Sequence, residues 1–422
     1  MPSPHPPPAP ALRWRLSLTL MVTLFVAYLD RMNISLALPL MASHYGWSVD
    51  ETRSHGSTLL TSFYVGYGLA NLFLSGAATR LGPRISLMLV ILLWSTFTAL
   101  GAWLSASLTV LLATRFLLGL SEGVHFPMMN VLTQRWFPPQ ERGRANSVWM
   151  AGLLLAICLA PVLLIPLMHA VGWQATFWLL ALAGPLLSLP LVWRHVFDRP
   201  QDHPAITAQE QMHIDECADP PSAAPADWAL WHAMTRPGVL LILASGIAYN
   251  IVAVGLSSWL PTYFVATKGL PYADLVYATS LPYVSGVMGL ALWSWLGDRT
   301  GARAALGALG FIGGGAALWM ALHASTLPLS IAGFALAVFS ISAFSACEFA
   351  IVQRQLPPEL MGPGAGIYNG LTTLIGGGAG PVLVSSIIGT QPEGQAQGVA
   401  AAIAVCVLAA TLLLILARRL RY

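Results

Sequence analysis

Long apolar runs alternate with short polar stretches along nearly the whole chain. A helix needs about 20 predominantly apolar residues to cross the hydrocarbon core of a bilayer, and runs of this length recur throughout. The alternating pattern of a membrane β-barrel is absent, and the runs are too long for barrel strands. The pattern predicts an all-α integral membrane protein with twelve transmembrane helices, at about 16–41, 55–79, 84–104, 107–130, 145–169, 174–194, 237–264, 275–297, 303–323, 327–350, 364–388 and 396–417.

The composition agrees with this interpretation. Of the 422 residues, 56% are hydrophobic and only 9% are charged, whereas a soluble domain carries about 25% charged residues. The first apolar run is too long, and too interrupted by charge, for a cleavable signal peptide. The four cysteines show no spacing typical of a disulfide framework or a metal site. We therefore expect neither a metal nor a cofactor.

Basic residues are distributed unevenly between the two sides of the predicted spans. Of the 20 Lys and Arg, only Arg53 and Lys268 flank one side, whereas sixteen flank the other. Cytoplasmic flanks carry the excess of basic residues, so we expect both termini in the cytoplasm and the protein in a plasma or bacterial inner membrane. The net charge of +3 follows from this distribution and predicts no nucleic-acid partner. The sixteen are Arg13, Arg15, Arg80, Arg84, Arg135, Arg142, Arg144, Arg194, Arg199, Arg236, Arg299, Arg303, Arg354, Arg418, Arg419 and Arg421.

The chain divides into two related halves. The segment Ser75–Arg84 aligns with Ser294–Arg303 at an offset of 219 residues, and Gln134 aligns with Gln353 at the same offset. Duplicated six-helix halves predict a carrier whose central site opens alternately to each side of the membrane. The expected parts are a disordered cytoplasmic tail (1–15), a first six-helix half (16–194), a cytoplasmic linker (195–236), a second six-helix half (237–417) and a cytoplasmic tail (418–422).

In the first third of the chain, four charged residues lie inside predicted spans: Asp30 and Arg31 in the first, Arg115 and Glu122 in the fourth. Charges at the membrane centre are costly, so they predict a site for an anion, for protons, or for both. Arg115 and Glu122 share a helix face with Gly119, which leaves room for a neighbouring helix or a substrate. Burial favours a protonated carboxyl group and a nearby arginine favours a charged one, so an arriving anion can change proton affinity. A structural ion pair between Arg115 and Glu122 is the alternative.

The segment repeated in the two halves has the form Arg-x-Gly-x-Arg. This pattern resembles the signature loop of the major facilitator superfamily, and the resemblance implies that fold and a gating role for both loops. The family has aspartate before the first arginine, and Thr79 stands in its place in the first half, so the usual charge latch is not expected there. The loop residues are Arg80, Gly82 and Arg84 in the first half, and Asp298, Arg299, Gly301 and Arg303 in the second.

Within that superfamily, the chain is similar to the anion:cation symporter family over most of its length. The resemblance implies that Asp30 and Glu122 are protonatable, that Arg31 engages the anionic substrate and that Arg115 sets the electrostatics around Glu122. It is carried by Tyr28–Asn33, Glu122–Pro127, Trp136–Arg142 and Gly366–Asn369.

Polar residues elsewhere in the spans are further candidates for substrate contacts. Tyr67 and Asn71 share a face of the second span, and Tyr368 and Asn369 offer a polar ledge from the eleventh. The family resemblance supports Tyr67 and Asn369 most directly. Asn71 is equally a residue that packs helices together, and Trp259 is equally an interfacial or gate residue.

Two titratable residues have open roles. His125 either relays protons, for which an ordinary imidazole is suited, or satisfies a buried hydrogen bond. Glu348 in the tenth span is either a third proton site or the partner of Arg354 near the interface, and its spacing favours the ion pair.

The predicted function is proton-coupled uptake of an organic anion, either a carboxylate or a sugar acid. A bound anion and protonated carboxyls neutralise the site, so the loaded carrier can reorient without a buried charge. The alternatives are a proton-coupled efflux antiporter and a receptor that has lost transport. No phosphate loop, metal cluster or nucleophile–base pair indicates an enzyme. The expected partners are the anion, protons and membrane lipid, with the carrier as a monomer.

Overall fold

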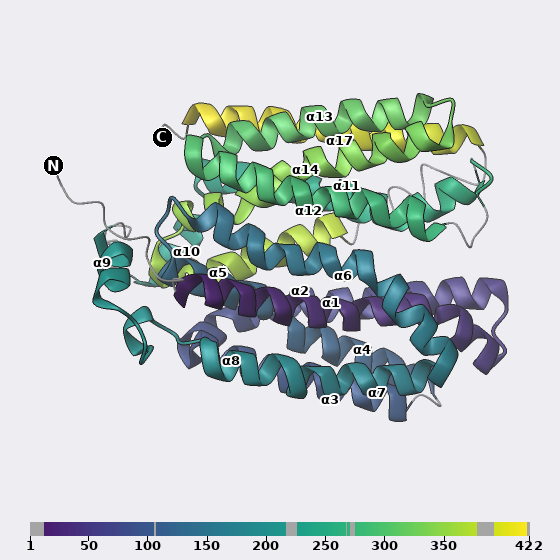
Figure 1. Ribbon diagram of the computed structural model, residues 1–422, viewed down its shortest axis with the longest axis horizontal. Helices are drawn as coiled ribbons and strands as arrows, with labels where there is room; N and C mark the ends of the chain where they lie inside the picture. The colour runs from purple at the N-terminus through teal and green to yellow at the C-terminus, as the bar shows by residue number, and fades with distance from the viewer. Residues whose placement is uncertain are drawn as a thin grey trace.

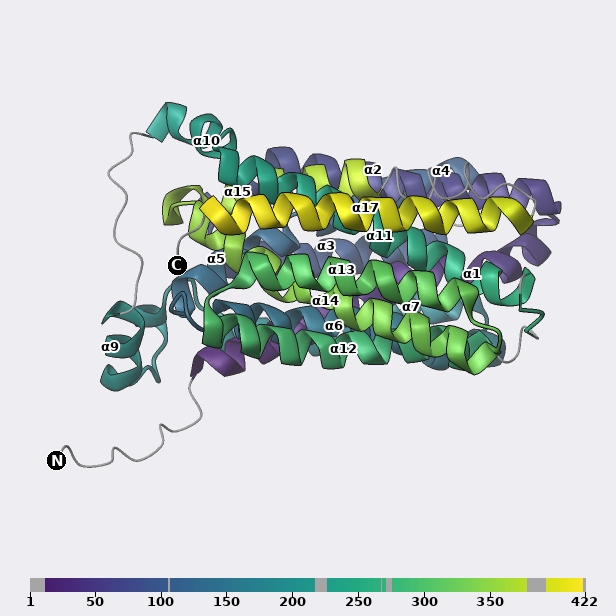
Figure 2. The ribbon, with the colours of Figure 1, turned by 90° about the horizontal axis from the view of Figure 1, so that it is seen from above.

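The computed structural model of the protein describes residues 12–104, 107–216, 226–266, 268–270, 275–377 and 392–419. Long helices run back and forth along one axis and form two bundles, drawn in purple to blue and in green to yellow (Figure 1). Two shorter helices of the linker, α9 (Ala208–Glu216) and α10 (Ala226–Met234), lie at one end of the bundles (Figure 2).

The first bundle is built from the N-terminal helices. Its last span contains a π-helical turn between α7 and α8. The helices are α1 (Leu12–Tyr45), α2 (Val49–Leu81), α3 (Pro83–Trp103), α4 (Leu108–Glu122), α5 (His125–Trp136), α6 (Arg142–Val171), α7 (Trp173–Ala183) and α8 (Leu189–His195).

The second bundle repeats this arrangement. The eleventh predicted span of the chain lies in this bundle; it begins as α15 and continues into a π-helical turn, Thr372–Gly377. The helices are α11 (Pro237–Ala266), α12 (Leu275–Thr300), α13 (Arg303–His323), α14 (Leu327–Gln355), α15 (Met361–Leu371) and α17 (Pro392–Arg419).

The all-α prediction is confirmed, since the described residues form helices and turns without a β-strand. Helices α2 and α12, which are not among the nine stretches given below, occupy the predicted spans 55–79 and 275–297. The predicted span 364–388 is described only to Gly377, so the count of twelve stays a prediction. Nine of the described helical stretches are long and apolar enough to cross a membrane: 12–38, 83–103, 108–136, 142–171, 173–195, 237–256, 303–323, 327–355 and 400–419.

Proline breaks two of the predicted spans. Pro127 lacks the N–H that would bond to the carbonyl of Gly123, and α4 gives way to α5 at this point. Pro185 likewise lacks a donor, and the chain forms the π-helical turn Gly184–Ser188 there. Glu122 therefore lies in the last turn of α4 rather than in the middle of a continuous helix.

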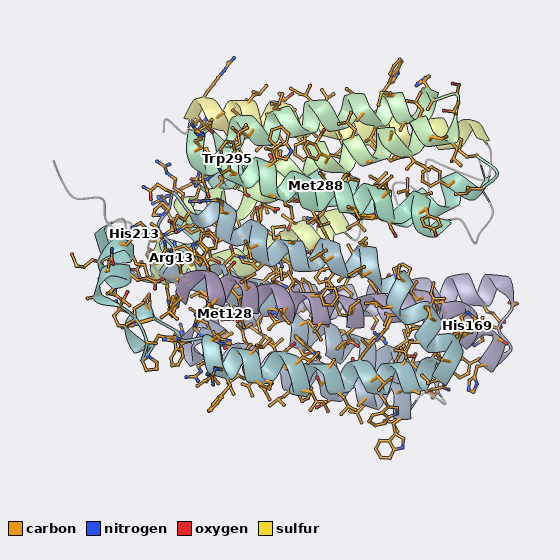
Figure 3. The ribbon with its side chains drawn as sticks, viewed as in Figure 1. Arg13, Met128, His169, His213, Met288 and Trp295 are labelled. Carbon is orange, nitrogen blue, oxygen red and sulfur yellow. The ribbon has the colours of Figure 1, made fainter. Side chains whose placement is uncertain are left out.

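One end of the bundles carries most of the arginines that the structure describes. Helices α1, α3, α6 and α13 begin at this end, with Arg13, Arg84, Arg144 and Arg303 in their first turns. We call it the arginine-rich end. Arg13 marks it in Figure 3, and His169 marks the opposite end.

Buried amides join the two halves near the arginine-rich end. Gln134 of α5 donates to the backbone oxygens of Gln353 and Leu356. Gln353 of α14 donates in turn to Asn130 and Asn146 of the first half, at 2.9 and 3.2 Å. Since all four side chains are buried, their hydrogen bonds would be left unmade if the halves separated here. This end is closed in the structure.

Asp298 forms a latch between the halves at the same end. Its carboxylate accepts from the N–H groups of Gly143 and Arg144, in the first turn of α6, at 3.2 and 2.9 Å. It also forms ion pairs with the Arg144 and Arg303 side chains at 3.0 and 2.9 Å. A carboxylate at a helix N-terminus satisfies unpaired N–H groups and the helix dipole together.

The repeat-related position, where α2 meets α15, lacks the equivalent latch, as the sequence predicts. Thr79 takes the place of Asp298 in the repeat and faces Gly362, which takes the place of Gly143. The hydroxyl of Thr79 donates to the backbone oxygen of Ser75 in its own helix. The counterpart of Arg144 is Pro363, which has no N–H to donate. Between α2 and α15, the counterparts of the Asp298 carboxylate and of the Arg144 N–H group are therefore both absent.

Helix α9 of the linker is docked on the first half. Glu210 accepts from the N–H groups of Leu12 and Arg13, at the N-terminus of α1. Arg13 bridges Glu210 to Glu141, and Glu141 also contacts His213 at 3.4 Å. Although burial raises the pKa of Glu141, the hydrogen bonds and charges of Arg13 and His213 outweigh it and hold that pKa below its usual value.

Candidate functional site

A buried ion pair joins the first span to the fourth. Arg31 of α1 donates from Nη2 to Oε2 of Glu122 on α4, at 2.8 Å. Both residues are almost inaccessible, at 8% and 1% exposure. The structural alternative from the sequence, an ion pair between Arg115 and Glu122, is not the arrangement found, since Arg31 occupies that position beside Glu122.

Aromatic rings enclose the guanidinium group of Arg31. Its carbon Cζ lies 4.2 Å from the ring centre of Tyr28, 4.7 Å from that of Phe63 and 4.8 Å from that of Tyr67. Ring faces attract a cation and restrict the side chain to one orientation. The charge is thereby held in place without a second acidic partner.

The ion pair leaves one polar atom on each side unused. Among the described residues, neither Nε of Arg31 nor Oε1 of Glu122 has a hydrogen-bond partner, although both atoms are buried. Buried polar atoms of this kind are rare in folded proteins and call for an explanation. A donor and an acceptor therefore remain for a molecule that reaches the pair.

A second chain of contacts connects Asp30 to Arg115. Asn33 donates to Asp30 at 2.9 Å, and Arg115 donates to the amide oxygen of Asn33 at 3.1 Å. Thr98 of α3 donates to the other oxygen of Asp30, and Arg115 lies over the ring of Phe177, 5.2 Å from its centre. The side-chain amide of Asn33 thus bridges the Asp30 carboxylate and the Arg115 guanidinium group, which do not contact each other directly.

Glycines bring α2 close enough to α4 to build the site. A Cβ atom on Gly119 would collide with the backbone oxygen of Phe63, and one on Gly66 with that of Phe116. The space beside Gly119 is thus filled by a neighbouring helix. This close approach holds Phe63 and Tyr67 against Arg31.

The site is joined to the second half through α15. Asn369 donates to the hydroxyl of Tyr67 at 3.0 Å and to the amide oxygen of Asn71 at 2.9 Å. Gly366 lies directly against the backbone oxygen of Asn71 and the side chain of Ser75, so its missing Cβ lets α15 pack closely on α2. Three of the predicted substrate residues thus form one cluster between the halves.

Tyr368, although adjacent to Asn369, faces away from this cluster. It is fully buried and donates to Oε1 of Glu348 at 2.7 Å. The observed contact of Glu348 is this hydroxyl, whereas the spacing along the helix had favoured Arg354. The sequence marks both residues as candidates, but their contact was not predicted.

The remaining predicted residues are dispersed. His125 contacts Thr23 at 3.4 Å and packs near Trp94, and the side chain of Trp259 lies outside the described residues. Of the loop residues, Gly82 and Gly301 adopt positive φ angles of 101° and 71°. Their neighbours lie at the arginine-rich end. Arg80 is exposed, and Arg299 lies over the ring of Trp295. Arg84 donates from its backbone N–H to the carboxylate of Asp198 and from its side chain to the backbone oxygen of Trp193.

Two neighbours of this chain of contacts were not predicted from the sequence: Thr98 beside Asp30 and Phe177 beside Arg115. Thr98 and Phe177 lie in apolar runs on α3 and α7, and nothing in their local pattern marks them. Within the described residues, no three His, Cys, Asp or Glu side chains are grouped as a metal site would require.

The chain is similar to known membrane transporters over most of its length. A probable sulfoacetate transporter of Cupriavidus necator is 30% identical over 366 residues, which cover 85% of this chain and 82% of the relative. A hexuronate transporter of Bacillus subtilis is 26% identical over 375 residues, covering 86% and 85%. These relatives indicate a transporter and agree with the expectation that the chain is not an enzyme.

Solved structures show the same fold. The human organic anion transporter MFSD10 superposes with a TM-score of 0.69 at 17% identity, covering 98% of this chain and all of the other. The proton:xylose symporter XylE superposes with a TM-score of 0.69 at 15% identity, covering 94% of each chain. The family model of the Major Facilitator Superfamily matches residues 20–381. The resemblance seen in the sequence motifs is therefore confirmed, and the chain belongs to the major facilitator superfamily.

Proposed function

We propose that this protein is a secondary transporter that takes up a small organic anion together with protons. The observation that carries the proposal is the buried pair of Arg31 and Glu122, in which each partner keeps one unused polar atom. An anion that accepts from Arg31 competes with Glu122 for the guanidinium group. Once displaced, Glu122 lies in an apolar environment where a charged carboxylate is costly, so it takes up a proton. Arrival of the anion and of the proton are thereby linked.

The names of the relatives support an anionic substrate. Sulfoacetate carries a sulfonate and a carboxylate, and hexuronates are sugar acids, so both present oxygens that a planar guanidinium can bind in a fork. The rings of Tyr28, Phe63 and Tyr67 leave the guanidinium little freedom. We infer that a carboxylate or a sulfonate is the group recognised at Arg31.

In this proposal Asp30 is the second proton-coupling group, and Arg115 acts on it through Asn33. Tyr67, Asn71 and Asn369 complete the substrate site from the two halves, whereas Tyr368 faces Glu348 instead. The arginine-rich end is the cytoplasmic side, because cytoplasmic flanks carry the excess of basic residues. The protein then works as a monomer surrounded by lipid, in a plasma or bacterial inner membrane, with both termini inside.

Proton movement in proteoliposomes tests the proposal directly. External pH would be recorded while sugar acids, sulfonates, aromatic acids and small dicarboxylates are added one at a time. We expect one class to make the external solution more alkaline, because protons enter with the anion. Empty liposomes serve as the control. Uptake would be contradicted if no anion of the panel changed the external pH and a cationic or neutral drug made the external solution more acidic. That result would favour an efflux antiporter.

Thr79→Asp is expected to slow the opening of the arginine-rich end. The carboxylate would lie beside the N–H of Gly362 in the first turn of α15, as Asp298 does at α6. One such contact contributes about 1 kcal/mol, which is roughly a fivefold change in rate or equilibrium. The measurement is the rate of labelled-substrate exchange, with affinity measured in parallel.

Thr79→Asn is the matched control, because it has nearly the same size as the aspartate and no charge. It should slow exchange less than Thr79→Asp. A change confined to substrate affinity would count against a latch at this position.

A further inference from the structure

The second half contains a buried carboxyl group that the mechanism above does not use. Glu348 lies on α14 at 4% exposure and accepts a hydrogen bond from Tyr368 of α15 at 2.7 Å. Tyr368 is followed by Asn369, whose side chain contacts Tyr67 and Asn71 in the first half. One turn of α15 therefore touches Glu348 on one side and the substrate cluster on the other.

The groups that face Glu348 carry no positive charge. Tyr368 of α15 and Tyr249 of α11 are the titratable side chains that interact with it. On α13, Arg303 is directed to Asp298 and to the oxygen of Pro139. In the described parts of the chain, no Lys, Arg or His lies within ion-pair distance of Glu348 on these helices or on α5, α6 and α12. A charged carboxylate in such surroundings is costly.

The pair with Tyr368 can accommodate both protonation states of Glu348. When the carboxyl is ionised, the tyrosine hydroxyl donates to it, as in the observed geometry. When the carboxyl is protonated, it can donate to the tyrosine oxygen, because the hydroxyl has a second acceptor. This acceptor is the backbone oxygen of Ile242, at 3.5 Å. No buried donor is left without an acceptor in either state.

Opening of the arginine-rich end changes the surroundings of this pair. Gly366 and Gly370 hold α15 against α2 in the closed structure, and Phe349 packs between Trp149 and Tyr368. Separation of the halves here removes the first-half side of this packing and lets water approach α14 and α15. A carboxyl group that is protonated behind the closed end can then ionise.

We propose that Glu348 is a further proton-carrying group of the transporter, which releases its proton when the arginine-rich end opens, and that Tyr368 is its positioning residue. The step is a simple proton exchange, in which the carboxyl O–H breaks, the proton goes to water and the carboxylate remains. The proposal rests on proton-coupled uptake, and it adds one proton to each cycle beyond those held at Asp30 and Glu122.

The test is the ratio of protons to substrate. Proton entry and labelled-substrate entry would be measured in the same proteoliposomes for the wild type and for Glu348→Gln. We expect the variant to keep substrate exchange within about twofold and to lose one proton per substrate. Glu359→Gln is the matched control, because it makes the same chemical change at an exposed carboxylate that follows α14.

The possible failures are distinct. A wild-type protein that moves no protons with substrate contradicts the proposed function itself. Coupled wild-type transport with an unchanged ratio in Glu348→Gln overturns only the role of Glu348. If Glu348→Gln fails to fold, Tyr368→Phe decides: a changed pH profile of exchange supports the proposal, and an unchanged profile overturns it.

Discussion

Glu122→Gln is expected to abolish accumulation of substrate against its gradient, while exchange of substrate across the membrane persists. The amide keeps the shape of the side chain but cannot carry a proton. Because Glu122 is the group at which anion binding and proton binding are linked, protons held at Asp30 and Glu348 then no longer move in step with the substrate, and the proton gradient no longer drives uptake. With a gradient of about one pH unit, one coupled proton supports about tenfold accumulation in the absence of a membrane potential. A variant from which all coupled protons are lost should reach the same substrate concentration on both sides.

The comparison requires two assays on the same preparation. Accumulation would be measured with an imposed pH gradient, and exchange would be measured with substrate on both sides and no gradient. Glu122→Asp, which retains a carboxyl group at the site, should keep part of the accumulation. Accumulation at wild-type levels in Glu122→Gln would show that coupling occurs elsewhere.

Arg31→Ala is expected to abolish binding of the anion, and Arg31→Lys to restore it poorly. Hydrogen bonds to charged groups contribute about 1.5–3 kcal/mol each, so removing a guanidinium that binds the anion through two of them should weaken affinity by roughly two to four orders of magnitude. Lysine keeps the charge but not the planar fork that Tyr28, Phe63 and Tyr67 hold in place. Equilibrium binding to purified protein gives the affinity directly.

A loss of stability must be separated from a loss of binding in this experiment. Removing one partner of a buried pair leaves the other charge uncompensated and costs about 3–5 kcal/mol. The double change Arg31→Ala with Glu122→Gln removes both charges and should recover much of the thermal stability without recovering affinity. Arg80→Ala, at an exposed position, should leave binding intact. Unchanged affinity in both Arg31 variants would remove Arg31 from the site.

The sequence predicts which helices exist better than how they meet. Helix α13 has the predicted bounds, 303–323, because its apolar run is ended on both sides by polar residues. The break at Gly123 was not predicted, although Pro127 offers a signal for it. Hydropathy reports the mean character of a segment, whereas a break depends on which single N–H is missing.

The chemistry of the site was only partly predicted, because the sequence does not show which residues of different helices meet. Residue types and family resemblance identified Arg31 and Glu122, but helical periodicity relates only residues of one helix. The contact between them joins positions 91 residues apart and depends on how α1 is rotated against α4. The same limit applies to Glu348 and Tyr368, 20 residues apart on two helices.

The unequal latches also bear on how the duplicated halves diverged. Asp298 and Arg144 in one pair of facing helices correspond to Thr79 and Pro363 in the other, so an acceptor and one of its donors both differ between the halves. With proline alone changed, a carboxylate at position 79 would keep only the N–H of residue 362, and with threonine alone changed, the N–H of residue 363 would lose its acceptor; either loss has a cost that selection can act on. Among homologous carriers, an acidic residue at the position of Thr79 should therefore coincide with a residue other than proline at the position of Pro363. An alignment in which the two positions vary independently would contradict this history.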